Sequence, residues 1–147
     1  MPTQTLAPVT GQDINLAANA VRGLLEQVLG RESTTFEPWL LLNLLATRGT
    51  ALARAEMVHT VASGTRANPD AIRQVVAQLE STGLIREASP GSAAVELSPT
   101  GTARHAHLRD AVTRLTNELY APFDATDLAI TKRVLNQVTE RANTGLG

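Results

Sequence analysis

The chain has 147 residues, 43% of them hydrophobic, with no cysteine and a net charge of −1 at pH 7. This length fits one domain, or one domain with a helical extension for contact with a partner. The lack of cysteine excludes disulfides, thiol catalysis and cysteine-bound metals, and the near-neutral charge excludes a global basic field that would attract nucleic acid. No signal pattern and no apolar run of membrane-spanning length is present. We therefore expect a soluble cytoplasmic protein with no membrane partner.

The N-terminal part predicts a loose arm and two helices. Residues 1–11 contain two prolines and are expected to form a flexible arm. Apolar residues recur at helical spacing from Asp13 to Leu29, which predicts a first helix with Asp13 or Gln12 near its start. A second helix is predicted over 37–47, where Trp39 begins a run that is apolar on nearly all sides. Such a helix is buried on most sides, and Thr50–Leu52 after it is predicted to be a short strand.

The central part predicts two short helices joined by a turn. Arg54–Ala62 reads as the first of these helices and Ser63–Thr65 as the turn. The second helix has clear edges: Asn68 can be its N-cap, Pro69 suits the first helical position, and Gly83 suits the left-handed position after the last turn.

A hairpin and two long helices complete the chain. Residues 84–88 and 93–97 are predicted to be strands joined by the turn Ser89-Pro90-Gly91-Ser92. The order helix, turn, helix, hairpin is typical of a winged helix-turn-helix, which points to a double helix as partner. Ser98-Pro99 then opens a long helix to Tyr120, and Asp124 or Thr126 can cap a last helix that runs to about Arg141. The first helix and the last two helices carry more apolar surface than one chain can bury. A second copy of the chain is the simplest partner to bury it, since most soluble oligomers are two-fold dimers.

Four segments in this order resemble the MarR family of bacterial transcription regulators. They are the Trp39–Leu45 helix with Thr50–Leu52, the segment Ala71–Ile85 with its "L-E-x-x-G-L-[IV]" exit, Val95–Gly101 at the exit of the wing, and Phe123–Leu128 before the last helix. The resemblance implies a mainly α fold with a small β-hairpin wing, in a triangular homodimer. It gives a winged helix-turn-helix lobe over 36–101 and dimerisation helices over 12–30 and 99–143, within one domain over 12–147.

One feature departs from the family pattern. Wings of the family usually carry an acidic residue and one or two arginines at the tip, whereas the tip here is Ser89-Pro90-Gly91-Ser92 and the nearest arginine is Arg86 at the base. A narrow minor groove attracts arginine strongly, so the sequence predicts a weakened contribution of the wing.

The second short helix carries the predicted DNA readers. With Ile72 at the centre of the buried face, the outward residues include side chains that can bond base edges, such as arginine to guanine and glutamine to adenine. Recognition helices touch the groove and the phosphates near their start. The predicted DNA-binding residues are Arg54, Arg66, Asn68, Arg73, Gln74, Ala77, Gln78 and Arg86. The alternative is an ordinary solvated helix face.

Other site classes receive little support. His105 and His107 are two residues apart and share no helical face, so no metal site is expected, and one of the two is expected at the surface or an interface. Trp39 is expected in the core, although the resemblance implies an effector site that Trp39 could line. No phosphate loop, nucleophile elbow or zinc-protease motif is present, so we expect neither an enzyme nor a cofactor.

Two functions from different classes remain. The first is a homodimeric, sequence-specific DNA-binding transcription regulator, expected to be a repressor released by a small-molecule effector. The second is a winged-helix dimer that has lost DNA binding and serves as a protein-interaction scaffold. The outward polar residues of the second short helix favour the first function, and the bare wing tip and the net charge of −1 favour the second.

Overall fold

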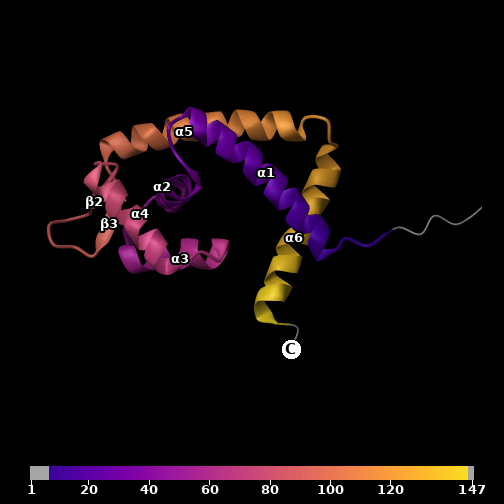
Figure 1. Cartoon of the computed structure of the whole chain (residues 1–147), viewed down its shortest axis with the longest axis horizontal. Coiled ribbons are helices and arrows are strands. Elements are labelled where there is room, and N and C mark those ends of the chain that lie inside the picture. The colour runs from indigo at the N-terminus through magenta and orange to yellow at the C-terminus, as the bar shows by residue number, and fades with distance from the viewer. Residues whose placement is uncertain (1–6, 146–147) are drawn as a thin grey trace, which may run out of the picture. The chain divides into compact units, whose positions relative to one another are not determined.

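The computed structural model describes residues 7–145, and the chain divides into two compact units, 1–115 and 116–147 (Figure 1). The first unit contains four helices and most of a fifth, namely α1 (Gly11–Arg31), α2 (Phe36–Arg48), α3 (Arg54–Thr65), α4 (Pro69–Ser81) and α5 (Pro99–Tyr120). The second unit contains the end of α5 and the helix α6 (Ala125–Thr144). No helix in the described part of the chain is long and apolar enough to span a membrane.

Helix α1 begins earlier than the sequence predicted. Thr10 is its N-cap: the Asp13 N–H donates to Thr10 Oγ1 over 3.2 Å, and the Thr10 N–H donates to Asp13 Oδ2 over 2.9 Å. This reciprocal capping box satisfies two amide groups that a helix start leaves open. The predicted arm therefore loses Gly11 to the helix, and its residues 1–6 lie outside the described part.

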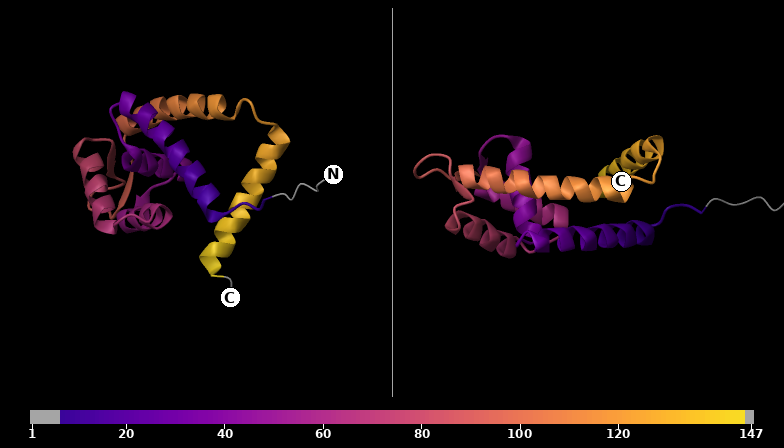
Figure 2. Two further views of the ribbon diagram at one scale, coloured as in Figure 1. Left: turned by 45° about the vertical axis from the view of Figure 1, so that its right-hand side comes forward. Right: turned by 90° about the horizontal axis from the view of Figure 1, so that it is seen from above.

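A small antiparallel sheet completes the lobe. Its strands are β1 (Leu52–Ala53), β2 (Ile85–Glu87) and β3 (Ala94–Leu97), in the order β1-β3-β2. In the connection between β2 and β3 the Ser92 N–H donates to the Ser89 carbonyl over 2.9 Å, and Gly91 has a φ of +77°. Proline followed by a glycine of positive φ is the signature of a type II turn. Figures 1 and 2 show this loop extending away from the helices, as a wing does.

The core lies between the end of α1, α2, α3, α4, the sheet and the first half of α5. Each of these elements turns its apolar residues inward, which removes them from water and stabilises the lobe. The largest side chains that are fully buried are Leu29, Leu41, Leu42, Met57, Ile72, Ile85, Val95 and Leu108. The predicted mainly α fold with a small hairpin wing is confirmed.

The start of α5 passes very close to the β-hairpin. Ser98 caps the helix, since its Oγ accepts the Gly101 N–H over 3.0 Å. A Cβ atom on Gly101 would lie 1.9 Å from the Leu84 carbonyl oxygen, so only glycine fits there. The predicted start at Ser98-Pro99 and the predicted end at Tyr120 both agree with the structure.

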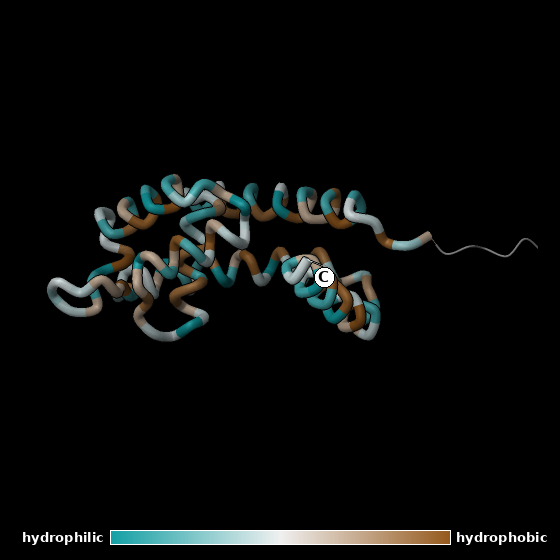
Figure 3. Tube along the Cα trace, turned by 90° about the horizontal axis from the view of Figure 1, so that it is seen from below, coloured by the Kyte–Doolittle hydropathy of each residue, from teal (hydrophilic) through white to brown (hydrophobic). Residues whose placement is uncertain are grey.

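Helix α6 is amphipathic but has no buried residue. Asp124 caps it by accepting the N–H groups of Thr126 and Asp127 at 2.8 and 3.2 Å. Ile130, Val134 and Val138, which share one helical face, are 45%, 43% and 44% exposed. Figure 3 shows apolar and polar residues alternating along this helix near the C-terminal label.

Candidate DNA-binding surface and pocket

Helix α4 presents a polar face to solvent. Asn68 caps it by accepting the Asp70 N–H over 2.9 Å, and Pro69 occupies the first helical position. Ile72, Val76 and Leu79 are buried against the lobe. The opposite face carries four of the predicted readers with exposed side chains: Arg73, Gln74, Ala77 and Gln78. These four side chains can therefore meet a partner outside the lobe.

The turn before α4 differs from the sequence prediction. We expected Ser63–Thr65 to form the turn, but α3 continues through these residues to Thr65. The turn instead begins at Arg66, which is exposed and has a left-handed backbone with a φ of 57°. Gly64 does not end the helix, because Val61 and Ala62 on the same helix are buried in the core. This tertiary packing overrides the low helix propensity of glycine. Arg66 and Asn68 both stand exposed at the start of α4.

Arg54 is engaged inside the protein. Its Nε and Nη2 donate to the two carboxylate oxygens of Glu80 over 2.6 and 2.8 Å, and its Nη1 donates to the carbonyls of Ser92 and Ala93 over 3.2 and 3.3 Å. The hydrogen bonds from Arg54 lower the pKa of Glu80, and the same pair raises the pKa of Arg54. These contacts join the end of α4 to the wing, and the phosphate contact of Arg54 stays a prediction.

Most of the other arginines of the lobe are also paired with carboxylates. Residues 36–101 contain five arginines and six acidic residues. Arg86 pairs across the sheet with Glu96, with Nη2 and Oε2 separated by 3.1 Å, and Arg48 pairs with Glu56. Arg73 forms an ion pair with Asp70 one turn earlier on α4. The electrostatic attraction of this lobe for a polyanion is therefore small.

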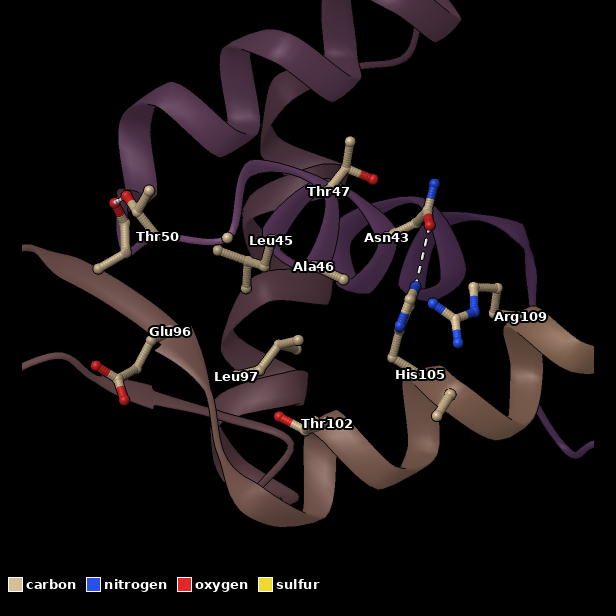
Figure 4. Close-up of a pocket in the computed structure, with 13 residues that line it drawn as sticks. Asn43, Leu45, Ala46, Thr47, Thr50, Glu96, Leu97, Thr102, His105 and Arg109 are labelled. Atoms are coloured by element: carbon tan, nitrogen blue, oxygen red, sulfur yellow. Dashed lines mark hydrogen bonds between the residues drawn. The ribbon is translucent and has the colours of Figure 1, made fainter.

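A pocket of about 660 Å³ lies between the second half of α2, β3 and α5. Figure 4 shows His105 and Arg109 projecting from α5 toward Asn43 on α2. Leu45, Ala46 and Leu97 give the pocket an apolar wall, and three threonines add hydroxyl groups: Thr47, Thr50 and Thr102. An apolar wall with a few converging polar groups is the usual form of a small-molecule site.

His105 forms the inner part of this pocket, and of the two histidines it is His107 that lies at the surface, as the sequence predicted for one of them. The residue is only 7% exposed, and its ring stacks on Trp39 with the ring centroids 5.6 Å apart. His105 Nε2 lies 3.0 Å from Asn43 Oδ1, and because an amide oxygen only accepts, Nε2 carries the proton. Burial, and then the positive charge of Arg109, lower the pKa of His105. His107, in contrast, is exposed and lies 2.6 Å from a Glu32 carboxylate oxygen.

Trp39 is buried, as predicted, and is not among the residues that line the pocket, but it stacks on His105, which is. Sequence reasoning did not find the group of Asn43, His105 and Arg109. Two signals were present: Asn43 is the one polar residue in the apolar run 39–45, and His105 and Arg109 are four residues apart and so share a helical face.

Comparison with known proteins gives a fold but no sequence relative. No protein-family model matches the chain, and no curated protein matches it. The MarR family protein Rv2887 of Mycobacterium tuberculosis, solved with p-aminosalicylic acid, is 22% identical with a TM-score of 0.71, covering 90% of this chain and 99% of its own. The same protein solved with DNA is 20% identical with a TM-score of 0.68, covering 89% and 98%.

A transcriptional regulator described as PA3341 is also similar, with 20% identity, a TM-score of 0.77, and coverage of 91% of this chain and 98% of its own. The similarity therefore spans nearly the whole length of each of these proteins. At such low identity it concerns the fold, which confirms the predicted architecture. The chain has the winged helix-turn-helix fold of MarR family transcription regulators.

Proposed function

We propose that the chain is a homodimeric transcription regulator that binds DNA through α4. The observation that carries this proposal is the exposed polar face of α4 at the outside of a winged helix-turn-helix lobe. In this class of lobe the second helix of the motif enters the major groove. Arg73 can bond guanine, Gln74 or Gln78 can bond adenine, and Ala77 leaves room for close approach. Arg66 and Asn68 stand where phosphates pass the helix start, and Arg86 stands at the base of the wing.

Fluorescence anisotropy against the intergenic DNA upstream of its own gene tests this proposal. We expect saturable binding that a shuffled duplex of the same composition does not reproduce. Arg73→Ala and Gln74→Ala should each weaken specific binding by about 1–3 kcal/mol, the usual value of a good bidentate base contact. Arg31→Ala is the matched control, because Arg31 is an exposed arginine at the end of α1. Unchanged binding by both α4 variants would show that α4 is not the reader.

The proposed dimer rests on the apolar residues that α1 and α6 leave exposed. Leu16 and Leu24 on α1 are 60% and 38% exposed, and Leu135 on α6 is 41% exposed, beside the apolar face of α6 described above. A second copy of the chain would remove these faces from water. Sedimentation equilibrium should therefore give a dimer at micromolar concentration.

Leu135→Asp should shift this equilibrium to monomer, because burying an unpaired charge costs several kcal/mol, on the order of 3–5. Asn136→Asp is the control, since residue 136 lies on the opposite side of α6 from the apolar face. A stable parent monomer, or equal effects of the two variants, would contradict the dimer.

The pocket beside His105 is the proposed effector site, and release of DNA on effector binding would make the protein a repressor. Rv2887 has been solved with p-aminosalicylic acid and with salicylic acid, so salicylate is a rational first probe. Arg109 offers a cation for its carboxylate, and the wall of Leu45 and Leu97 suits its ring. Trp39 is the single tryptophan of the chain and stacks on His105, so its fluorescence reports on occupation of the pocket.

Salicylate should change Trp39 fluorescence with saturation and lower DNA affinity. Arg109→Gln should weaken both effects, and Arg114→Gln, one turn further along α5, should leave them unchanged. A salicylate response that Arg109→Gln does not alter would place the ligand elsewhere.

The scaffold function is the second candidate, and the charge of the lobe favours it. With five arginines against six acidic residues in 36–101, the lobe has little non-specific attraction for phosphate. A parent dimer that binds no duplex even at low salt would support the scaffold and contradict the regulator.

A further inference from the structure

The ion pair between Asp70 and Arg73 occupies the end of α4 that would face the bases. The two residues are three apart and so lie on neighbouring positions of one helical face. Arg73 Nη1 donates to Asp70 Oδ1, while both side chains remain exposed, at 62% for Arg73 and 79% for Asp70. Asp70 itself is held in the first turn, where its backbone N–H is bonded to the Asn68 cap. The carboxylate therefore has a fixed origin from which it can orient the guanidinium.

We propose that Asp70 is a specificity-determining residue, which positions Arg73 to read guanine and disfavours its use as a phosphate contact. The proposal rests on the proposed DNA-binding function. Arginine has five N–H donors in a rigid planar fork, and Asp70 engages a single nitrogen, Nη1. The Nε–Nη2 edge remains available for the O6 and N7 acceptors of guanine. Holding one edge of the fork reduces the number of orientations that Arg73 must lose on binding.

The negative charge of Asp70 has a second effect. A free arginine binds any phosphate, which raises affinity for all sequences alike. A carboxylate beside Arg73 repels the phosphate backbone, and its own second oxygen can accept only from a donor such as an exocyclic amino group of cytosine or adenine. The pair thus lowers general affinity and raises the difference between the correct and the incorrect base.

The simpler explanation is a pair that only stabilises the exposed helix. Under that explanation Asp70 is one more negative charge near DNA, and its removal raises affinity for every duplex by the same factor. Under our proposal its removal raises general affinity but reduces discrimination at one base pair. The two explanations therefore differ in the pattern across sequences, not in the direction of the mean affinity.

The test begins with the full-length parent protein and a randomised duplex library. Selection gives a preferred site, and anisotropy then measures the affinity for that site and for each single base-pair replacement. Asp70→Asn is the key variant, because it keeps the shape and removes the charge. Glu56→Gln is the matched control: Glu56 is an exposed acid of the same lobe, paired with Arg48 on a different helix. Circular dichroism melting establishes that each variant is folded.

We expect Asp70→Asn to lose about tenfold in discrimination at one G·C pair, within the range that a bidentate base contact provides, and to keep discrimination at the others. Arg73→Ala should lose discrimination at the same pair, and the double variant should lose no more than Arg73→Ala alone, since the two residues act as a unit. Glu56→Gln should change all affinities by one factor.

Two results would overturn the inference while leaving the proposed function intact. One is a uniform gain for Asp70→Asn that matches Glu56→Gln. The other is loss of discrimination at a base pair for Arg73→Ala while Asp70→Asn retains it. A parent that selects no sequence at all would instead contradict the proposed DNA-binding function itself.

Discussion

Arg66 has a backbone conformation that favours glycine, yet it carries a long basic side chain. At a φ of 57° a non-glycine residue is strained by about 1 kcal/mol or more. Its own N–H caps α3 by donating to the Ala62 carbonyl, which needs the conformation but not the side chain. The turn therefore depends on the backbone of Arg66 and not on its guanidinium group, and we expect the guanidinium to contact a DNA phosphate.

Arg66→Gly should accordingly change stability and DNA binding in different ways. The free energy of unfolding should stay equal or rise slightly, because relief of strain is offset in part by the greater freedom of glycine in the unfolded chain. DNA affinity should fall. The negative slope of log K against log salt should become shallower by about 1 for each arginine lost, or about 2 per dimer. Arg66→Lys, which keeps the charge, should retain most of the slope. Equal DNA binding by the glycine variant would remove Arg66 from the interface.

His105 provides a second residue-scale prediction, concerning pH. Burial lowers its pKa in the folded protein, while in the unfolded chain it titrates near 6.5. As the pH falls through that value the unfolded state takes up the proton first, so the folded state loses stability. Urea denaturation at pH 7.5 and 5.5 should show a smaller loss for His105→Gln than for the parent. An equal loss in both proteins would mean that other groups carry the pH dependence.

The ends of the helices are the elements that the sequence predicted best. Asn68-Pro69 and Ser98-Pro99 start helices where expected, because capping depends on residues adjacent in the chain. The turn at Ser63–Thr65 was predicted wrongly, since the burial that holds α3 together is not a local property. The Arg54–Glu80 pair spans 26 residues and the His105–Asn43 hydrogen bond spans 62. Contacts between residues so far apart in the chain arise from the packing of elements. The partners of Arg54 and His105 could therefore not be predicted from the residues beside them in the sequence.

The contact between α5 and the hairpin gives the prediction at the scale of elements. Gly101→Ala would place a Cβ atom 1.9 Å from the Leu84 carbonyl oxygen, and because that neighbour is backbone, α5 or the hairpin must move. Such overpacking typically costs about 1–3 kcal/mol, measurable by urea denaturation. Gly64→Ala on α3 is the control: nothing lies within 4 Å of its added Cβ, and alanine in a helix should stabilise by roughly 0.5–1 kcal/mol. A neutral Gly101→Ala would mean that the two elements adjust without strain.

At the scale of the whole molecule, this chain differs from a strongly basic DNA-binding protein in its charge. The net charge is −1, and four arginines of the lobe are paired with carboxylates in the structure, leaving Arg66 as the arginine of 36–101 with no ion pair among the described residues. Sequence-independent affinity depends on how many phosphates are neutralised. The proposed regulator should therefore depend on base contacts from α4 more than on its overall field.

The dependence of DNA binding on salt tests this balance. We expect a slope of log K against log salt shallower than about −6 for the dimer, with a Kd of about 10⁻⁷ to 10⁻⁸ M at physiological salt. An arginine added to the wing should steepen the slope and tighten binding to sites flanked by A·T pairs, whose narrow minor groove attracts arginine. Ser92 is a poor position for this arginine, because the Ser92 hydroxyl accepts the Ala94 N–H and the substitution would remove that hydrogen bond. Ser89 is exposed at the turn, so Ser89→Arg is the better variant. A steep parent slope, or no gain from Ser89→Arg, would show that the wing contacts DNA by another route or lies clear of it.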